Sequence, residues 1–137
     1  MITRVTFRLA GLDGRTSAAV TRRTGIRPTR SFEAADPVSR RSGRARGYSL
    51  WLLSSSTAIE DGSELAGQLH RVLDFLEPAT AQLWELVGAG YDANWLGYVA
   101  SHATEHAAEL DRRTLQRLLA LPGDLWLDVC GDGTDSA

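Results

Sequence analysis

The stretch Arg4-Val-Thr-Phe-Arg-Leu-Ala10 carries the clearest strand pattern in the chain. Apolar side chains alternate with polar or small ones along it, and this period of two predicts a β-strand with one buried face. The positions predicted to be buried are Val5, Phe7 and Leu9. Downstream, Asp13-Gly14 predicts a turn, and a short helix is expected over 16–24 because Gly25 suits its C-terminal cap.

Further strands and helices are predicted along the rest of the chain. Pro28 keeps residues 25–32 extended, which favours a short edge strand. Leucines at helical spacing predict a helix up to Leu76, and Pro78 separates it from a second helical piece that ends at Gly88. The remaining predicted elements are strands over 48–53, 91–100 and 125–130 and a helix over 112–121 whose N-cap is Asp111.

The resulting order, β-α-β-β-α-β-α-β, predicts an α+β fold in a single domain over 1–130. Its first six elements match a ferredoxin-like βαββαβ core, and the last two form a C-terminal αβ extension. We therefore expect an antiparallel or mixed sheet with helices on one face. The tail over 131–137 is predicted to be disordered.

Charge is distributed unevenly along the 137 residues. All fifteen basic residues are arginine, which excludes mechanisms that need a lysine amine, such as Schiff-base chemistry. Eleven arginines and three acidic residues fall within 1–47, while four arginines and fourteen acidic residues follow. Either the basic part pairs with the acidic body, or it presents a basic surface to an anionic partner. Four arginines crowd the segment 33–47, which is predicted to be a long loop, at Arg40, Arg41, Arg44 and Arg46.

The cysteine count, the lack of long apolar runs and the net charge limit the expected compartment and partners. The single cysteine, Cys130, excludes an intrachain disulfide framework. No apolar run resembles a signal peptide or approaches the length of a membrane span, so we expect a cytoplasmic protein without a membrane partner. Nucleic acid is not an expected partner, because the net charge is −2 and no aromatic RNA-binding signature is present.

Several short motifs resemble a known family. They are Phe7-Arg-Leu-Ala-Gly11, Gly25-Ile-Arg-Pro-Thr-Arg-Ser-Phe32 with Asp36 after it, Tyr48-Ser-Leu-Trp51, Leu76-Glu-Pro78 and Leu125-Trp-Leu-Asp-Val129. Together they resemble the bacterial domain-of-unknown-function family 4279. The resemblance implies a small α+β domain and no assigned activity.

The face of the sheet away from the helices is the first candidate for a binding site. Alternation along the strands assigns Arg8, Trp126 and Asp128 to that face, and Trp51 joins them if Leu50 and Leu52 face the helices. Aromatic area with charges of both signs is typical of recognition surfaces. The alternative is that the loop over 33–47 covers the two tryptophans as part of the core.

Titratable residues form the second candidate. The string His102-Ala-Thr-Glu-His106 fits the H-x-x-E-H pattern of zinc peptidases, but the predicted helix begins after it and the chain is too short for that fold, so no metal or other cofactor is expected. His102 or His106 with Asp92 or Asp128 would instead suit general acid–base chemistry.

Two function classes follow. The preferred hypothesis is a non-catalytic recognition domain for a protein or peptide, of which an immunity-type inhibitor is one form, with the loop arginines steering an acidic partner. The alternative is a small cofactor-free acid–base enzyme of the isomerase or cyclase type. A shallow face lined by tryptophan favours the first, and a closed apolar pocket with convergent titratable groups favours the second. The oligomeric state is left open.

Overall fold

A computed structural model describes residues 2–36, 47–55, 64–101 and 108–131. The strands are β1 (Ile2–Gly11), β2 (Arg30–Phe32), β3 (Ser49–Ser54), β4 (Asp92–Ser101) and β5 (Asp124–Gly131). The helices are α1 (Ser17–Thr24), α2 (Leu65–Leu76), a 3-10 turn over Glu77–Ala79, α3 (Thr80–Gly88) and α4 (Arg112–Leu119). The predicted element order and the α+β class are confirmed.

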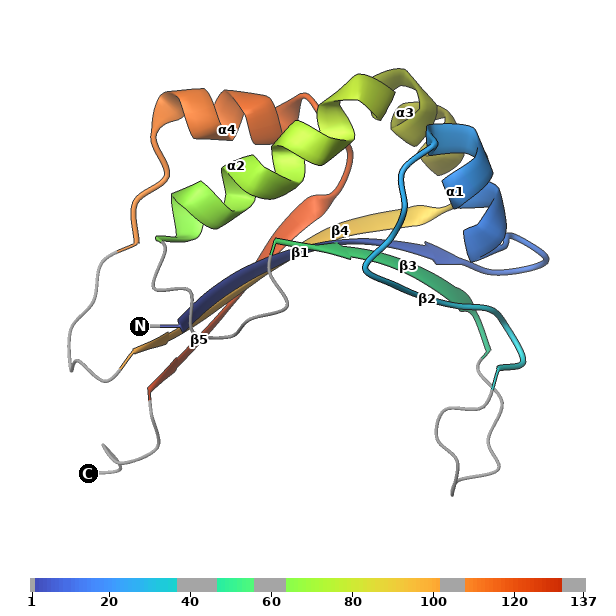
Figure 1. Cartoon of the computed structure of the whole chain (residues 1–137), viewed down its shortest axis with the longest axis horizontal. Coiled ribbons are helices and arrows are strands. Elements are labelled where there is room, and N and C mark those ends of the chain that lie inside the picture. Colours follow the sequence, from blue (N-terminus) through green and yellow to red (C-terminus); the bar gives the residue numbers. More distant parts are fainter. Residues whose placement is uncertain (1, 37–46, 56–63, 102–107, 132–137) are drawn as a thin grey trace.

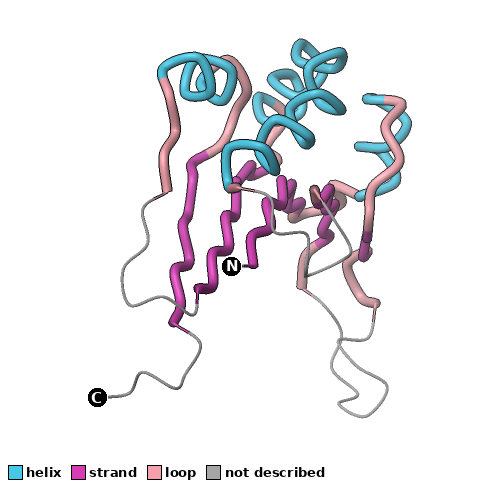
Figure 2. The backbone as a smooth tube through the Cα atoms, turned by 60° about the vertical axis from the view of Figure 1, so that its left-hand side comes forward, coloured by secondary structure: helices cyan, strands magenta, loops and turns pink. Residues whose placement is uncertain are grey.

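The strands form one mixed sheet in the order β2-β3-β1-β4-β5. The pairs β2–β3, β3–β1 and β1–β4 are antiparallel, whereas β4 and β5 are parallel and are joined through α4. Both ribbon views place every helix on the same side of the sheet (Figures 1 and 2). Among the described residues, the other side carries no helix, and we call it the open face.

The core lies between the sheet and the helices and is centred on β1. Val5, Phe7 and Leu9 are buried, as their alternation predicts. The Phe7 ring meets the ring of Trp95 edge-on at 4.9 Å between centroids and that of Trp51 at 6.4 Å. Leucines of α2 and α3 cover the core from the helix side. Because each helix buries one face, these leucines recur at helical spacing in the sequence.

Local turn and cap chemistry fixes where the elements begin and end. Asp13 and Gly14 both adopt positive φ angles, and Gly25 caps α1 at a φ of 71° while its N–H donates to the Thr21 carbonyl. At the start of α4, the Asp111 carboxylate accepts a hydrogen bond from the Thr114 N–H at 2.8 Å. The predicted N-cap of this helix is therefore confirmed.

The prediction for Trp51 is wrong. Trp51 pairs with Leu9 across β3 and β1, so its indole lies on the helix side, where it is 0% exposed. There the indole N–H donates to the Thr21 hydroxyl of α1 at 3.0 Å, while Leu50 and Leu52 take the open face. A continuous apolar run has no alternation, so the sequence of β3 could not indicate which side faces the core.

The predicted faces of the β5 side chains are confirmed, but the expected burial of its apolar side chains is not. Leu125 pairs with buried Trp95 and Val129 with buried Val99, so the odd-numbered positions face the helix side. Yet Leu127 is 50% exposed and Val129 is 72% exposed, because β5 is the outermost strand and runs out from under the helix layer (Figure 1). The strand includes Gly131, one residue beyond the predicted domain end, and 132–137 lie outside the described residues.

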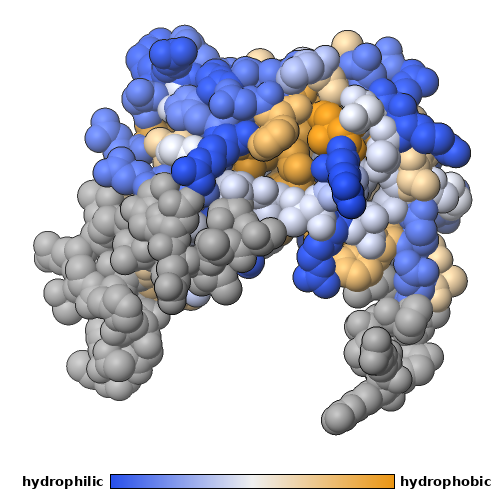
Figure 3. Space-filling view, in the orientation of Figure 1, coloured by the Kyte–Doolittle hydropathy of each residue, from blue (hydrophilic) through white to orange (hydrophobic). Residues whose placement is uncertain are grey.

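The outer surface of the helix layer is largely hydrophilic, and an apolar area is visible between α2 and α1 (Figure 3). Within the described part of the chain, no helix has the length and apolar content needed to cross a bilayer.

Candidate functional site

Strand register determines which side chains share the open face. Residues paired across neighbouring strands point to the same side of a sheet. The open face therefore carries four cross-strand rows: Asp128–Tyr98–Arg4, Trp126–Leu96–Thr6–Ser54, Asp124–Asn94–Arg8–Leu52–Arg30 and Asp92–Ala10–Leu50–Phe32. This arrangement brings together charges of both signs from β1, β2, β4 and β5 and aromatic rings from β2, β4 and β5.

A shallow hollow lies at the β4–β5 end of the face. It measures about 440 Å³ and is lined by Arg4, Thr6, Leu96, Gly97, Tyr98, Trp126, Leu127 and Asp128. Trp126 is 66% exposed. A large uncovered aromatic ring can stack on a ligand, while a guanidinium and a carboxylate that line the same hollow orient that ligand.

A smaller hollow of about 260 Å³ lies at the other end, lined by Arg8, Ala10, Leu12, Tyr48, Gly90 and Asp92. The Arg8 Nη2 donates to the Asn94 side chain at 2.9 Å, within the row that these two residues share on the open face. The Nε–H of Arg8 is buried and has no hydrogen-bond partner among the described residues. A buried donor without a partner is costly, and an acceptor on a ligand would satisfy it.

The Cys130 thiol contacts Asp128, which lines the first hollow. Its Sγ–H donates to the Asp128 carboxylate at 3.5 Å, and this hydrogen bond raises the pKa of the Cys130 thiol, with burial and the negative charge of Asp128 adding to the effect. The thiol form is therefore favoured over the nucleophilic thiolate.

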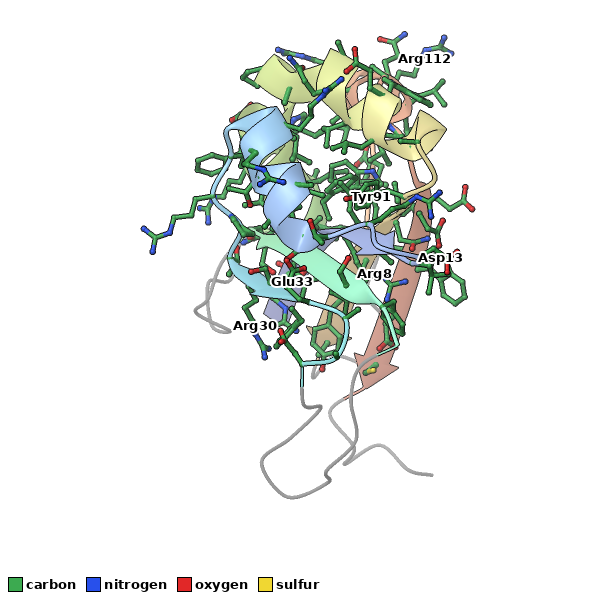
Figure 4. The ribbon with its side chains drawn as sticks, turned by 90° about the vertical axis from the view of Figure 1, so that its right-hand side faces the viewer. Arg8, Asp13, Arg30, Glu33, Tyr91 and Arg112 are labelled. Atoms are coloured by element: carbon green, nitrogen blue, oxygen red, sulfur yellow. The ribbon has the colours of Figure 1, made fainter. Side chains whose placement is uncertain are left out.

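A third concavity, of about 670 Å³, lies between α1 and β2 and includes Arg22, Arg27 and Arg30 in its lining. The Glu33 carboxylate occupies the start of α1 there, accepting from the Ser17 N–H at 2.6 Å, the Ser17 hydroxyl at 2.7 Å and the Ala18 N–H at 3.3 Å (Figure 4). Burial raises the pKa of Glu33, but the hydrogen bonds from Ser17 and Ala18 outweigh it and hold that pKa below its ordinary value. The protein's own carboxylate thus fills the anion site of this helix.

The structure brings together three of the four residues predicted to bind a ligand. Arg8, Trp126 and Asp128 share the open face, and Trp51 does not. Asp92 is on the same face, but six residues separate it from the position opposite Asp128, which amounts to about 20 Å along a strand. Asp92 and Asp128 therefore do not converge on one reacting group.

The other predicted site residues lie outside the described residues. They are His102 and His106, either of which was predicted to act with Asp92 or Asp128, and the steering arginines Arg40, Arg41, Arg44 and Arg46. Within the described ranges, no group of three histidine, cysteine or acidic residues is placed to hold a metal ion.

Arg4, Tyr98 and Tyr48 were not among the residues predicted for the open-face site. Arg4 has the same parity as Arg8 along β1, so the alternation already placed it on this face, but nothing singled it out. Tyr98 and Tyr48 could not be found that way, because only the pairing of Tyr98 with Arg4 and Asp128, and the position of Tyr48 beside Arg8, makes them part of a hollow.

These features define a small α+β domain with a five-stranded mixed sheet, helices on one side and a polar–aromatic face on the other. Residues 1–131 match the family model described as "Domain of unknown function (DUF4279)", and the chain belongs to that family. The resemblance noted in the sequence is thereby confirmed. No curated protein and no solved structure matches the chain.

Proposed function

We propose that the protein is a non-catalytic recognition domain that binds a protein or peptide segment on the open face of its sheet. The observation that carries this proposal is the hollow around Trp126, whose ring is 66% exposed and shares the lining with Arg4 and Asp128. Interfaces obtain most of their affinity from a few aromatic and arginine side chains with polar groups around them. An immunity-type inhibitor of a partner protein is one form that such a domain takes.

The topology explains why this face is available. We propose that β1 to β4 form a ferredoxin-like unit. Two observations support this description: neighbouring strands are antiparallel in the order β2-β3-β1-β4, and the connections between parallel strands run through α1 and through α2–α3. Crossover connections between parallel strands share one hand, so both connections place their helices on the same side. The opposite side of the sheet is then left to side chains of the strands.

The enzyme alternative has less support from the described residues. Its two candidate carboxylates, Asp92 and Asp128, line separate hollows at opposite ends of the face. Both hollows are shallow, and neither encloses an apolar pocket with several titratable groups, which general acid–base chemistry at a small molecule requires.

The test is selection of peptides from a random phage-displayed library on the wild-type protein, followed by titration calorimetry with a selected peptide. Trp126→Ala is expected to weaken binding by about thirtyfold, which corresponds to roughly 2 kcal/mol for a central aromatic anchor. Trp84→Ala is the matched control, because Trp84 is also an exposed tryptophan but lies on α3, in the helix layer. Equal binding by Trp126→Ala and wild type, or a loss with Trp84→Ala instead, would contradict the proposal.

A further inference from the structure

The outer edge of β5 differs from the opposite edge of the sheet, which β2 forms. β5 pairs with β4 on one side, and no other strand in the described part of the chain pairs with its second side. Along eight residues, alternate backbone N–H and C=O groups therefore point outward. Large apolar side chains accompany them on both faces, with Leu127 and Val129 on the helix side and Trp126 on the open face.

The opposite edge of the sheet is built differently. β2 has only three residues, follows Pro28 and carries the exposed Arg30. Short length, proline and charge are the devices that keep an edge strand from pairing with another chain. β5 is long and contains no proline, and its only charged residues are Asp124 and Asp128, so it is the edge better suited to accept a strand.

The sequence of β5 is also compatible with pairing to β5 of a second copy of the chain. Two edges that join about a two-fold axis perpendicular to the sheet run antiparallel and place residues of the same face opposite each other. An axis at Trp126 would put Asp124 opposite Asp128, and an axis at Asp128 would put that carboxylate opposite its own copy. An axis at Leu127 avoids both repulsions, since like charges directly opposite each other destabilise a pair of strands.

We propose that β5 pairs antiparallel with β5 of a second copy of this chain about an axis at Leu127, which joins the two sheets into one. In this register Leu127 meets its own copy and Leu125 meets Val129, so the exposed apolar side chains of the helix side cover one another. The two aspartates exclude the two neighbouring registers, and axes at Leu125 or Val129 would pair fewer residues of the strand. This dimer does not depend on the proposed recognition of a peptide.

The pairing also changes the hollow on the open face. Trp126 lies opposite Asp128 of the second copy, and both residues line the hollow of about 440 Å³ in each chain. The two hollows then meet across the axis. The second copy thus contributes an aromatic ring and a carboxylate to each hollow.

Charge exchange at the axis tests the register with full-length protein. Leu127→Arg and Leu127→Glu each place two like charges opposite each other, and position 127 is half-exposed, so folding is retained and is checked by circular dichroism. In sedimentation velocity we expect a dimer for wild type, a monomer for each variant alone and a heterodimer when the two variants are mixed. A monomeric wild type at every soluble concentration, a dimer of either variant alone, or a mixture that stays monomeric overturns the proposal.

A cysteine pair tests it independently. In the proposed register residue 124 faces Cys130 of the second copy, at a separation that a disulfide can bridge. Within one chain the same two positions are about 20 Å apart along the strand, so they cannot join. Asp124→Cys is expected to give a covalent dimer on a non-reducing gel after mild oxidation, whereas the control Asp124→Cys with Cys130→Ser is not. An uncrosslinked Asp124→Cys protein, or equal crosslinking of the control, contradicts the register.

Discussion

The orientation of Trp51 can be tested by removing the group that accepts its indole hydrogen bond. Trp51 is 0% exposed, and its Nε1–H donates to the Thr21 hydroxyl at 3.0 Å. Thr21→Val keeps the shape of the side chain and nearly the same helix propensity, so α1 itself is little affected. The substitution leaves a buried N–H without an acceptor, which costs about 1–3 kcal/mol of unfolding free energy.

A double-mutant cycle separates this cost from any other effect of the substitution. Trp51→Phe removes the indole N–H, so Thr21→Val should cost close to nothing in that background. The assay is urea unfolding followed by circular dichroism at 222 nm, because the tryptophan substitution alters the fluorescence signal. If Thr21→Val costs the same in both backgrounds, Trp51 does not donate to Thr21 and the assignment of its face to the helix side is refuted.

Two further predictions concern charged side chains that hold helices. Because hydrogen bonds keep the pKa of Glu33 below 4.5 in the folded protein, its contribution is complete above that value and is lost as the pH falls through the lower folded pKa. Glu33→Gln should therefore lower the free energy of unfolding by about 0.5–2 kcal/mol at neutral pH and weaken its dependence on pH in the acidic range. Urea titrations between acidic and neutral pH would measure both effects. An unchanged pH dependence would contradict the role of Glu33 at the start of α1. Arg117 joins α4 to α2 through an ion pair with Asp74 at 2.7 Å and hydrogen bonds to Glu77, and both carboxylates are exposed. Arg117→Gln should cost about 1 kcal/mol at low salt and less at high salt, so a loss independent of salt in thermal melts would contradict an electrostatic role.

The positions of helices and strands were largely predictable because their signals are local. The alternation of Val5, Phe7 and Leu9 marks the central strand, and Gly25 and Asp111 mark helix ends through their own backbone and side-chain chemistry. Each of these signals depends on a few neighbouring residues, so no knowledge of the rest of the fold is needed.

The candidate site was predictable only in part. Arg8, Trp126 and Asp128 were placed correctly because their strands alternate. Trp51 was misplaced because β3 is apolar throughout, and the exposure of Val129 was missed because alternation assigns a face without telling how far the helices extend over it. The other hypotheses depend on His102, His106 and the arginines Arg40, Arg41, Arg44 and Arg46, which lie outside the described residues.

The sequence by itself determined the element order, the α+β class and the side to which each alternating strand turns its apolar residues. The tertiary structure decided which residues from different strands meet: Tyr98 with Arg4 and Asp128, and Trp51 with Leu9. It also decided that β5 lies at the edge of the sheet with Leu127 and Val129 exposed. The physical reason is that periodicity and capping act over a few residues, whereas register and edge position arise from hydrogen bonding between segments far apart in the chain.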